Sequence, residues 1–380
     1  MVSADKKPIP FNRPYLSGEE FDLMRAAIDG GHISGDGDFT KRAHGLIAQI
    51  TGVDSVLLTT SCTHALEMTA LLLELAPGDE VIVPSFTFVS TVNAVILRGA
   101  IPVFVDIRLD TLNMDESKVE ELITPHTRAI VVVHYAGVAC EMDAINEVAA
   151  RHGIAVVEDA AHGFGGTYHG RQLGNLGQMA ALSFHETKNI QCGEGGALLL
   201  NDPRLVERAE ILREKGTNRS RFFRGEFDKY TWVDVGSSYL PSDLLAAFLC
   251  AQLGHFDEIQ AQRMHVWSTY DIELSDWAAR RDITRTKVPQ HCEHPGHLYY
   301  LLLSDTAERE RFIAHMADRG VKCVFHYVPL HSSPMGRRLA PTAVCPITED
   351  VSSRLVRLPV FAGMSTVELE RVVHGVRSFE

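Results

Sequence analysis

The chain has 380 residues, of which 45% are hydrophobic and 22% charged, a composition typical of a soluble globular protein with room for two or three domains. Its formal net charge of −13 argues against a nucleic-acid partner, because proteins that bind a phosphate backbone normally carry a basic face. No apolar run approaches the roughly 18 residues that span a bilayer, and the first residues are polar, so we expect no membrane segment and no secretion signal.

Seven short apolar runs in the first half of the chain predict strands, and amphipathic stretches predict helices in most of the gaps. The runs are almost continuously apolar, which fits strands covered on both faces. The predicted strands are 56–60, 80–85, 101–107, 129–137, 154–161, 179–185 and 197–201. The predicted helices are 17–31, which begins with a capping box from Ser17 to Glu20, then 61–75, 114–123, 141–153 and 203–216. This alternation predicts an open, largely parallel α/β sheet.

The pattern changes after about residue 215. Residues 216–232 are polar, basic and aromatic without a clear period, and a loop of this length is usually functional or mobile. The remaining predictions are one or two helices in 241–274, a strand at 297–304, a helix at 307–320, a strand at 321–330 and a last helix near 366–377. We therefore expect a large domain over residues 1–250 and a small α+β domain over 251–380.

The seven cysteines are scattered without a C-x-x-C pair, which is typical of reduced thiols and predicts a cytoplasmic protein. The segment HCEHPGH at 291–297 matches no standard zinc spacing. We interpret it as structural and expect no metal.

Ligands of open α/β sheets bind at the carboxyl ends of the strands, so polar residues there are candidate site residues. Ser61, Cys62 and Thr63 follow the first strand at the start of a helix, where free amides suit a phosphate. Plain N-capping by Ser61 or Thr60 would explain the same residues.

Acidic, aromatic and basic residues follow three further strands. Asp159 ends an apolar strand with His162 just beyond it, so the carboxylate could be a metal ligand, a general base, the partner of a buried cation or a solvated strand end. Phe88 follows the second strand and could be core or a platform for a cofactor. Lys188 lies just before the glycines of GEGG at 193–196, although a lone lysine is usually a surface residue.

One ligand would use four of these features together: the helix start at 61–63, the aromatic Phe88, the acidic Asp159 and the basic Lys188. Pyridoxal 5′-phosphate has a phosphate, a flat ring, a ring nitrogen that is held protonated by a carboxylate, and an aldehyde that condenses with a lysine amine. The sequence therefore predicts a site for this cofactor.

The segments TTSCTHALEM, PSFTFVST, VVEDAAHGFGG, SFHETKN and GEGG, in this order, resemble the DegT/DnrJ/EryC1/StrS family of sugar aminotransferases. The resemblance extends through VFHYVPLH at 324–331 and covers nearly the whole chain. It implies the aspartate-aminotransferase fold (fold type I), with a large domain built on a mostly parallel seven-stranded sheet and a smaller C-terminal α+β domain.

The resemblance also implies a role for each cofactor-site residue. Lys188 would form the Schiff base and shuttle the proton during catalysis, and Asp159 would pair with the ring nitrogen. Phe88 would stack on the ring, and His162 would lie near its 3′-oxygen. The phosphate would be held by Cys62, Thr63 and Ser183, with Ser238 of a partner subunit replacing the family's usual asparagine.

Within the family, SFHETKN, REKGTNRS, DKYTW and GSSYLPSDLLAAFL resemble enzymes that convert dTDP-4-keto-6-deoxyglucose to dTDP-4-amino-4,6-dideoxygalactose with L-glutamate as donor. The implied partners are this sugar nucleotide, glutamate and a second subunit that completes the site. Implied substrate contacts are Lys215, Arg219, Tyr327 and His331. Arginines of the 213–224 segment suit a pyrophosphate, although a solvated loop would explain them too, and His326 and His331 could be structural.

Other activities in the family are amination of a different keto sugar and dehydration, in which histidine replaces the Schiff-base lysine; Lys188 argues against dehydration. A non-catalytic regulator that senses the cofactor or a sugar nucleotide would keep the same fold. Retention of the lysine, the aspartate, the aromatic residue and the phosphate site favours an enzyme.

Overall fold

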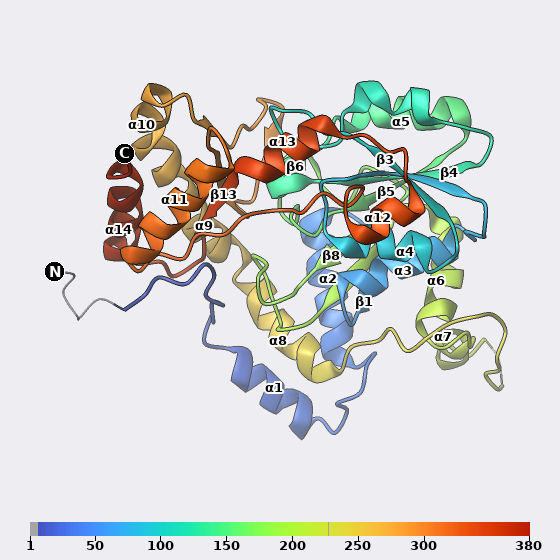
Figure 1. The fold of residues 1–380 in the computed structure, drawn as a ribbon. Coiled ribbons are helices and arrows are strands. Elements are labelled where there is room, and N and C mark those ends of the chain that lie inside the picture. The colour runs from blue at the N-terminus through green and yellow to red at the C-terminus, as the bar shows by residue number, and fades with distance from the viewer. Residues whose placement is uncertain (1–6, 227) are drawn as a thin grey trace.

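The computed structural model describes residues 7–226 and 228–380. Figure 1 shows a large α/β part built on the central sheet, a smaller part that contains the C-terminus, and an N-terminal arm that runs along the smaller part. In the arm, Ile9 is fully buried and forms a parallel bridge with Val321, so the arm packs against the smaller part.

The central sheet has seven strands in the order β1-β9-β8-β5-β4-β2-β3. All but β9 run in one direction, since β1 and β8 are both antiparallel to β9 and the other pairs are parallel. The bounds are β1 Ser55–Thr59, β2 Glu80–Pro84, β3 Ile101–Val105, β4 Thr127–Val133, β5 Ala155–Asp159, β8 Met179–Ser183 and β9 Gly196–Leu200. The seven predicted strands and the mostly parallel sheet are thus confirmed.

Helices cover both faces of this sheet (Figure 1), which explains why its strands are apolar on both sides. In β2, Val81 and Val83 point into the core under one set of helices, whereas Ile82 points into the core on the opposite face. The first set is α3 Cys62–Leu72, α4 Val89–Ile96 and α6 Val206–Arg213; the other face is covered by α2 Asp38–Thr51, α5 Met142–His152 and α8 Asp243–Gly254.

The smaller part has its own core around an antiparallel sheet in the order β10-β12-β13. Its elements are β10 Thr284–Arg285, β12 Tyr299–Leu302, β13 Leu355–Leu358, α9 Phe256–Glu273, α10 Ser275–Arg280, α11 Thr306–Asp318, α13 Pro346–Arg354 and α14 Thr366–Arg377. Within the described ranges, no helix combines the length and hydropathy that a bilayer crossing requires.

The predicted domain boundary at residue 250 lies inside α8. Helix α9 contributes Ile259 to a core of the large part and Val266 to the core of the smaller part. We therefore propose α9 as the link between two domains. A further buried cluster joins Phe86 and Tyr135 of the large part to Tyr300 of the smaller part, so the two cores are in direct contact.

Four sequence predictions need correction. Residues 114–123 form two short 3₁₀ turns, Glu116–Lys118 and Glu120–Leu122, in place of a helix. The predicted strand 321–330 makes only isolated bridges at Val321 and Val324. The stretch 203–216 begins with the 3₁₀ turn Pro203–Leu205, and α6 ends at Arg213.

The fourth correction concerns the capping box before α1 Glu20–Asp29, which forms only in part. The buried Glu20 carboxylate accepts the backbone N–H groups of Ser17 and Gly18, but the Ser17 hydroxyl accepts from Glu19 and not from Glu20. Glu20 also accepts a hydrogen bond from Gln252 of α8, so it ties α1 to the large domain.

The sequence analysis missed α2, α4, α10, α13, β10 and β13, together with α12 Pro334–Leu339 and a small sheet of β6 Thr167–Tyr168, β7 Arg171–Gln172 and β11 Cys292–Glu293. Among residues 216–226 and 228–232 there is one short helix, α7 Arg219–Phe223. The segment 291–297 includes β11, which pairs with β6.

Candidate active site

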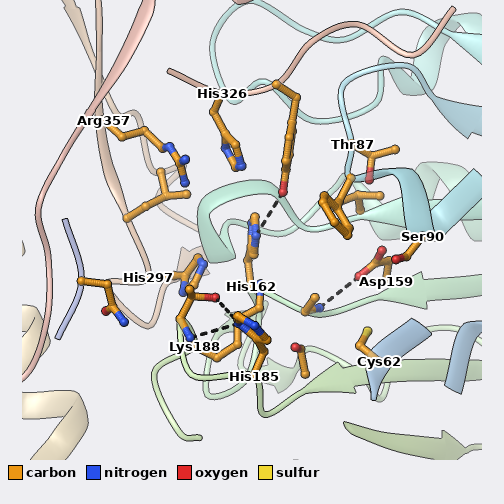
Figure 2. A pocket seen from close by; sticks show the side chains of 18 of the residues that line it. Cys62, Thr87, Ser90, Asp159, His162, His185, Lys188, His297, His326 and Arg357 are labelled. Atoms are coloured by element: carbon orange, nitrogen blue, oxygen red, sulfur yellow. Dashed lines mark hydrogen bonds between the residues drawn. The ribbon is translucent and has the colours of Figure 1, made fainter. Parts of the chain in front are cut away.

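A cavity of about 680 Å³ lies where the carboxyl ends of the central strands face the small domain. Lys188, Asp159 and His162 line it from the large domain, and His326 and Arg357 line it from the small domain. In Figure 2, Arg357 and His326 lie on one side of the cavity and Asp159 on the other, with His162 and Lys188 between them. Seven of the predicted site residues line this cavity: Cys62, Thr63, Phe88, Asp159, His162, Ser183 and Lys188; the predicted substrate contact Tyr327 does so too.

One end of the cavity is formed by the first turn of α3. Ser61 is the N-cap and accepts the N–H of His64 at 3.1 Å, so the capping alternative is correct for Ser61. Cys62 and Thr63 are the first helical residues, and N–H groups at these positions have no acceptor within the helix. Thr63 Oγ1 lies 2.8 Å from Ser90 Oγ. The turn therefore offers amides and hydroxyls to an anion, helped by the helix dipole.

Gly196 of β9 packs directly against this turn. A Cβ atom at residue 196 would lie 2.4 Å from the Cys62 nitrogen, closer than non-bonded atoms can approach. Because Gly196 pairs with Ser183 in the sheet, the last glycine of GEGG brings β8, β9 and the start of α3 together. Ser183 lies at the end of β8 and lines the same end of the cavity.

Asp159 ends β5 as a buried carboxylate held by hydrogen bonds. Its Oδ2 accepts from the Thr91 hydroxyl at 2.7 Å, and its Oδ1 accepts the N–H of Ala161 at 3.2 Å. Thr87 lies 2.8 Å from Thr91 and can donate to it, which completes a chain of hydroxyls behind the carboxylate. Burial raises the pKa of Asp159, although the hydrogen bond from Thr91 opposes the shift. A cation placed against Asp159 would stabilise the ionised form.

Lys188 lies in a turn five residues beyond β8. Its backbone N–H donates to the His185 carbonyl at 2.8 Å. Burial lowers the pKa of Lys188 to about 8, and the nearby Cys62 and Asp159 oppose this shift. A substantial fraction of this amine is neutral near pH 8, and a neutral amine is a nucleophile.

His162 has a buried ring nitrogen, Nδ1, without a hydrogen-bond partner among the described residues. Its Nε2 lies 3.4 Å from the Tyr327 hydroxyl, and its ring stacks on His297 with centroids 4.3 Å apart. Burial and the positive charges of Lys188 and Arg357 lower the pKa of His162 well below its usual value, so the ring is neutral. In either tautomer Nδ1 is left with an unused donor or acceptor.

Phe88 lines the same cavity, yet 57% of its surface is exposed. A large aromatic side chain at the mouth of a cavity suits a flat ring as its stacking partner.

Four predicted residues do not line the cavity. Ser238 is exposed and forms a bridge with Glu214, and Lys215 and Arg219 lie within 4.0 Å of the Glu214 carboxylate on the same surface. His331 is buried, and its ring contacts Ser85 at 2.7 Å and Glu349 at 3.1 Å. These contacts favour a structural role for His331.

The sequence analysis did not identify Thr91, Ser90, His297 or Arg357 as site residues. Ser90 and Thr91 are the last two residues of the quoted segment PSFTFVST, so their position just after a strand end was a usable signal. Arg357 and His297 come from the small domain, more than 100 residues beyond Lys188, and nothing local in the sequence relates them to the cavity.

Comparison with known proteins identifies the family. Residues 14–377 match the model of the DegT/DnrJ/EryC1/StrS aminotransferase family, almost the entire chain. The chain belongs to this family. The resemblance noted in the sequence is thus confirmed, and the protein is an aminotransferase of fold type I.

Solved structures agree with this assignment. The aminotransferase TlmJ from Streptoalloteichus hindustanus is 30% identical, with 98% of each chain covered and a TM-score of 0.90. DesV from S. venezuelae is 31% identical over 98% of each chain, with a TM-score of 0.89. Spr1654 from Streptococcus pneumoniae, a candidate sugar aminotransferase, has been solved in PLP and PMP forms; the PLP form is 26% identical, covers 98% of each chain and has a TM-score of 0.89.

Aminotransferases of this family use pyridoxal 5′-phosphate, and the residues of this chain fit that cofactor. The first turn of α3 suits the phosphate, the exposed Phe88 suits the ring, and the buried Asp159 has no cation bonded to it among residues 7–226 and 228–380. The unpartnered Nδ1 of His162 suits the oxygen on the ring.

Proposed function

We propose that this protein transfers the amino group of L-glutamate to C4 of a nucleotide-linked 4-keto-6-deoxyhexose, with dTDP-4-keto-6-deoxyglucose as acceptor and dTDP-4-amino-4,6-dideoxygalactose as product. The observation that carries the proposal is one cavity in which a buried lysine amine, a buried carboxylate and the start of a helix face the same space. The cofactor is pyridoxal 5′-phosphate. Cys62, Thr63, Ser90 and Ser183 would hold its phosphate end, and Asp159 would hold its ring nitrogen.

When bound, pyridoxal phosphate supplies an aldehyde that condenses with amines and a protonated ring that withdraws electrons from the carbon being deprotonated. Asp159 holds the proton on the ring nitrogen, and Thr91 orients the carboxylate by donating to Oδ2. Lys188 would accept the proton from the substrate carbon at Nζ and would then donate it again from the same atom. Its lowered pKa suits both steps, since Nζ must lose and regain a proton near neutral pH.

The choice of acceptor rests on the sequence. The segments SFHETKN at 183–189 and GSSYLPSD at 236–243 resemble the enzymes that make the 4-amino-4,6-dideoxygalactose nucleotide. Spr1654, which is described as a candidate sugar aminotransferase, supports the wider class of sugar acceptors. Two alternatives belong to the same chemical class: an acceptor with a 3-keto group, and a product with the opposite configuration at C4. A product assay distinguishes both from the proposed reaction.

We further propose that the protein works as a homodimer with the active site at the interface. Ser238, Lys215 and Arg219 form a polar surface away from the cavity of their own chain. Next to it lie exposed hydrophobic residues, Tyr230, Trp232, Val233 and Val235. If a second subunit covered this surface, Ser238 of one subunit would reach the cofactor phosphate bound in the other subunit. Lys215 and Arg219 would likewise reach the sugar nucleotide bound in the other subunit. The cytoplasmic location remains a prediction.

The test is incubation of the purified holoenzyme with L-glutamate and dTDP-4-keto-6-deoxyglucose. We expect 2-oxoglutarate and an amino sugar nucleotide in equal amounts, with the galacto configuration at C4 by NMR. A panel with 3-keto and other 4-keto sugar nucleotides tests the acceptor. A better rate with a 3-keto sugar, or a gluco product, would overturn the proposed acceptor or product, and absence of 2-oxoglutarate with every acceptor would favour the regulator.

A further inference from the structure

His297 is a cavity residue whose position is fixed from several sides. Its backbone carbonyl accepts a hydrogen bond from the buried Arg263 of α9 at 2.7 Å. Its ring nitrogen Nδ1 lies 2.9 Å from Oδ1 of Asn189, the residue that follows Lys188 in the chain. Its ring also stacks on His162, and Figure 2 shows the two rings side by side. These contacts hold the ring beside the turn that carries the lysine before any substrate binds.

The contacts of Asn189 determine which nitrogen of His297 carries the proton. Nδ2 of Asn189 donates to the Pro295 carbonyl at 2.7 Å and to Oε1 of Gln260 at 3.0 Å. A carbonyl can only accept, so the atom that faces Pro295 is the amide nitrogen, and Oδ1 faces His297. Because Oδ1 can only accept as well, Nδ1 of His297 carries a proton and donates it. In a neutral ring, Nε2 is then an acceptor.

The ring of His297 is neutral, and its Nε2 is unused. Burial lowers the pKa of His297 well below its usual value, and the nearby positive charge of Lys188 adds to this shift. Within residues 7–226 and 228–380, no hydrogen bond is formed with Nε2, and this atom is not one of the fully buried unpartnered atoms. Since His297 lines the cavity, its Nε2 is a fixed acceptor that a ligand can reach.

The charged groups around this acceptor favour an uncharged donor as its partner. Lys322 and Arg357 line the same cavity as cations, so they disfavour a second positive charge there. The two carboxylates of the cavity already have contacts: Asp159 accepts hydrogen bonds on both oxygens, and Glu194 lies 3.7 Å from His185. A neutral amine or a hydroxyl group entering the cavity would find an unused acceptor at Nε2.

We propose that Nε2 of His297 accepts a hydrogen bond from the amino group of the donor substrate. The inference deepens the proposed function, since it rests on an amino acid as the donor. In an aminotransferase, the substrate amine and the lysine amine react with the same aldehyde carbon, so the substrate amine must come close to Lys188. His297 lies beside the Lys188 turn through its contact with Asn189. An acceptor in this place suits the N–H groups of the arriving amine.

The hydrogen bond would orient the amine without taking its proton. An α-amino group has a pKa of about 8 in solution, whereas the pKa of His297 lies well below that of an ordinary histidine, so the ring is the weaker base. With one N–H directed at Nε2, the lone pair of a neutral amine points away from the ring and is free to react. A protonated imidazole could not serve, because both of its nitrogens are donors.

The experiment measures how tightly L-glutamate binds the PLP form of the holoenzyme, from the absorbance change of the first half-reaction. Asparagine places a polar atom at the position of Nδ1 and glutamine at that of Nε2, so two substitutions separate the nitrogens. We expect His297→Asn to weaken the apparent binding of glutamate roughly 5- to 100-fold, the effect of leaving an N–H without an acceptor. His297→Gln, which keeps a carbonyl oxygen near the position of Nε2, should retain most of the binding.

A neighbouring histidine provides the matched control. His294 belongs to the same segment, but its ring packs on Trp267 and does not line the cavity. His294→Phe should change glutamate binding less than about twofold, since it is independent of the acceptor. A loss as large as that of His297→Asn would mean that any disturbance of this segment weakens binding, and would overturn the inference.

Ligands with and without an amine separate amine binding from a general loss of structure. Glutarate has the carboxylates of glutamate but no amine, so calorimetry should show the same binding to wild type and to His297→Asn. The amino sugar nucleotide carries an amine and should bind His297→Asn more weakly in the reverse half-reaction. A sugar hydroxyl is the other group that Nε2 could accept from, and it would give weaker binding of sugar nucleotides with unchanged binding of glutamate. That result would overturn the inference.

Three further outcomes would overturn it: unchanged glutamate binding in His297→Asn, equal losses for glutamate and glutarate, and a loss in His297→Gln as large as that in His297→Asn. All of these leave the proposed function intact, because they concern only the contact at Nε2. Conversely, a wild-type enzyme that releases 2-oxoglutarate from glutamate but aminates no keto sugar would overturn the proposed acceptor. The contrast between His297→Asn and His297→Gln with glutamate would still test the inference.

Discussion

The two walls of the cavity differ in how completely their polar groups are satisfied. On the large-domain wall, Asp159 accepts from Thr91 and Ala161, and Thr63 contacts Ser90, so these groups have partners before any ligand binds. On the small-domain wall, Arg357 has an orphaned Nε, and its hydrogen bond goes to a carbonyl. A wall prepared by internal hydrogen bonds suits a cofactor that stays in place. A wall with unused donors suits substrates that are exchanged in every catalytic cycle.

Among substitutions on the large-domain wall, replacing Lys188 should cause the largest loss of activity. In Lys188→Ala the amine that moves the proton is absent, so we expect the transamination rate to fall by at least about 10³-fold. The measurement is 2-oxoglutarate release, together with the absorbance of added pyridoxal phosphate, which should show no lysine adduct. Lys41→Ala is the control, because Lys41 is exposed and pairs only with Asp38; normal turnover in Lys188→Ala would contradict the mechanism.

Replacing Asp159 should lower the activity of the enzyme but raise the stability of the cofactor-free protein. Asp159→Asn keeps an acceptor for Thr91 but removes the negative charge, so we expect the rate to fall about 10²-fold or more. Burial raises the pKa of Asp159, which means that the native state bears the cost of an ionised carboxylate above the unfolded pKa. The variant without cofactor should therefore be more stable at pH 7 by about 0.5–2 kcal/mol. This gain should vanish as the pH falls and Asp159 becomes protonated; a loss of stability at pH 7 would contradict the account.

A pair of glycine substitutions tests whether the large-domain wall depends on the close approach of the β9 backbone to the start of α3. Gly196→Ala would push a methyl group against the Cys62 nitrogen, and we expect a loss of about 1–3 kcal/mol in unfolding free energy together with weaker cofactor binding. Gly45→Ala lies in an exposed interior position of α2 with no atom within 4 Å of the new methyl group. It should stabilise the protein by about 0.5–1 kcal/mol. Chemical denaturation and cofactor titration measure both, and equal effects of the two substitutions would refute the packing argument.

The pH dependence of cofactor attachment tests the environment of Lys188. Because burial lowers the pKa of Lys188 to about 8, the neutral amine increases about fivefold between pH 7 and 8 and less than twofold between pH 8 and 9. The rate at which cofactor-free protein reacts with pyridoxal phosphate should follow this curve. A rate that keeps rising tenfold per pH unit up to pH 10 would indicate an ordinary, solvated lysine.

The sequence predicted the large-domain wall of the cavity far better than the small-domain wall. The seven strands are short, continuously apolar runs, and residues at their ends, such as Asp159 and Lys188, converge because parallel strands share one edge. The small-domain wall comes from segments with weak local signals. Residues 321–330 look like a strand but bridge only at single residues, since the N-terminal arm and β13 lie on either side of them. The segment RLVRLPV contains Arg354 and Arg357, and only the fold determines that Arg357 lines the cavity whereas Arg354 pairs with Asp350.

The smallest expected effect comes from Thr91, which acts on the cofactor only through Asp159. Thr91→Val keeps the shape of the side chain but removes the hydroxyl that donates to Oδ2, so the carboxylate becomes harder to ionise. We expect a roughly fivefold to tenfold loss in kcat/KM and a shift of the acid limb of the pH profile to higher pH. Thr91→Ser keeps the hydroxyl and should restore both values. If Thr91→Ser were as impaired as Thr91→Val, with no shift of the pH profile, Thr91 would serve packing alone, and the large-domain wall would be held by shape and not by its internal hydrogen bonds.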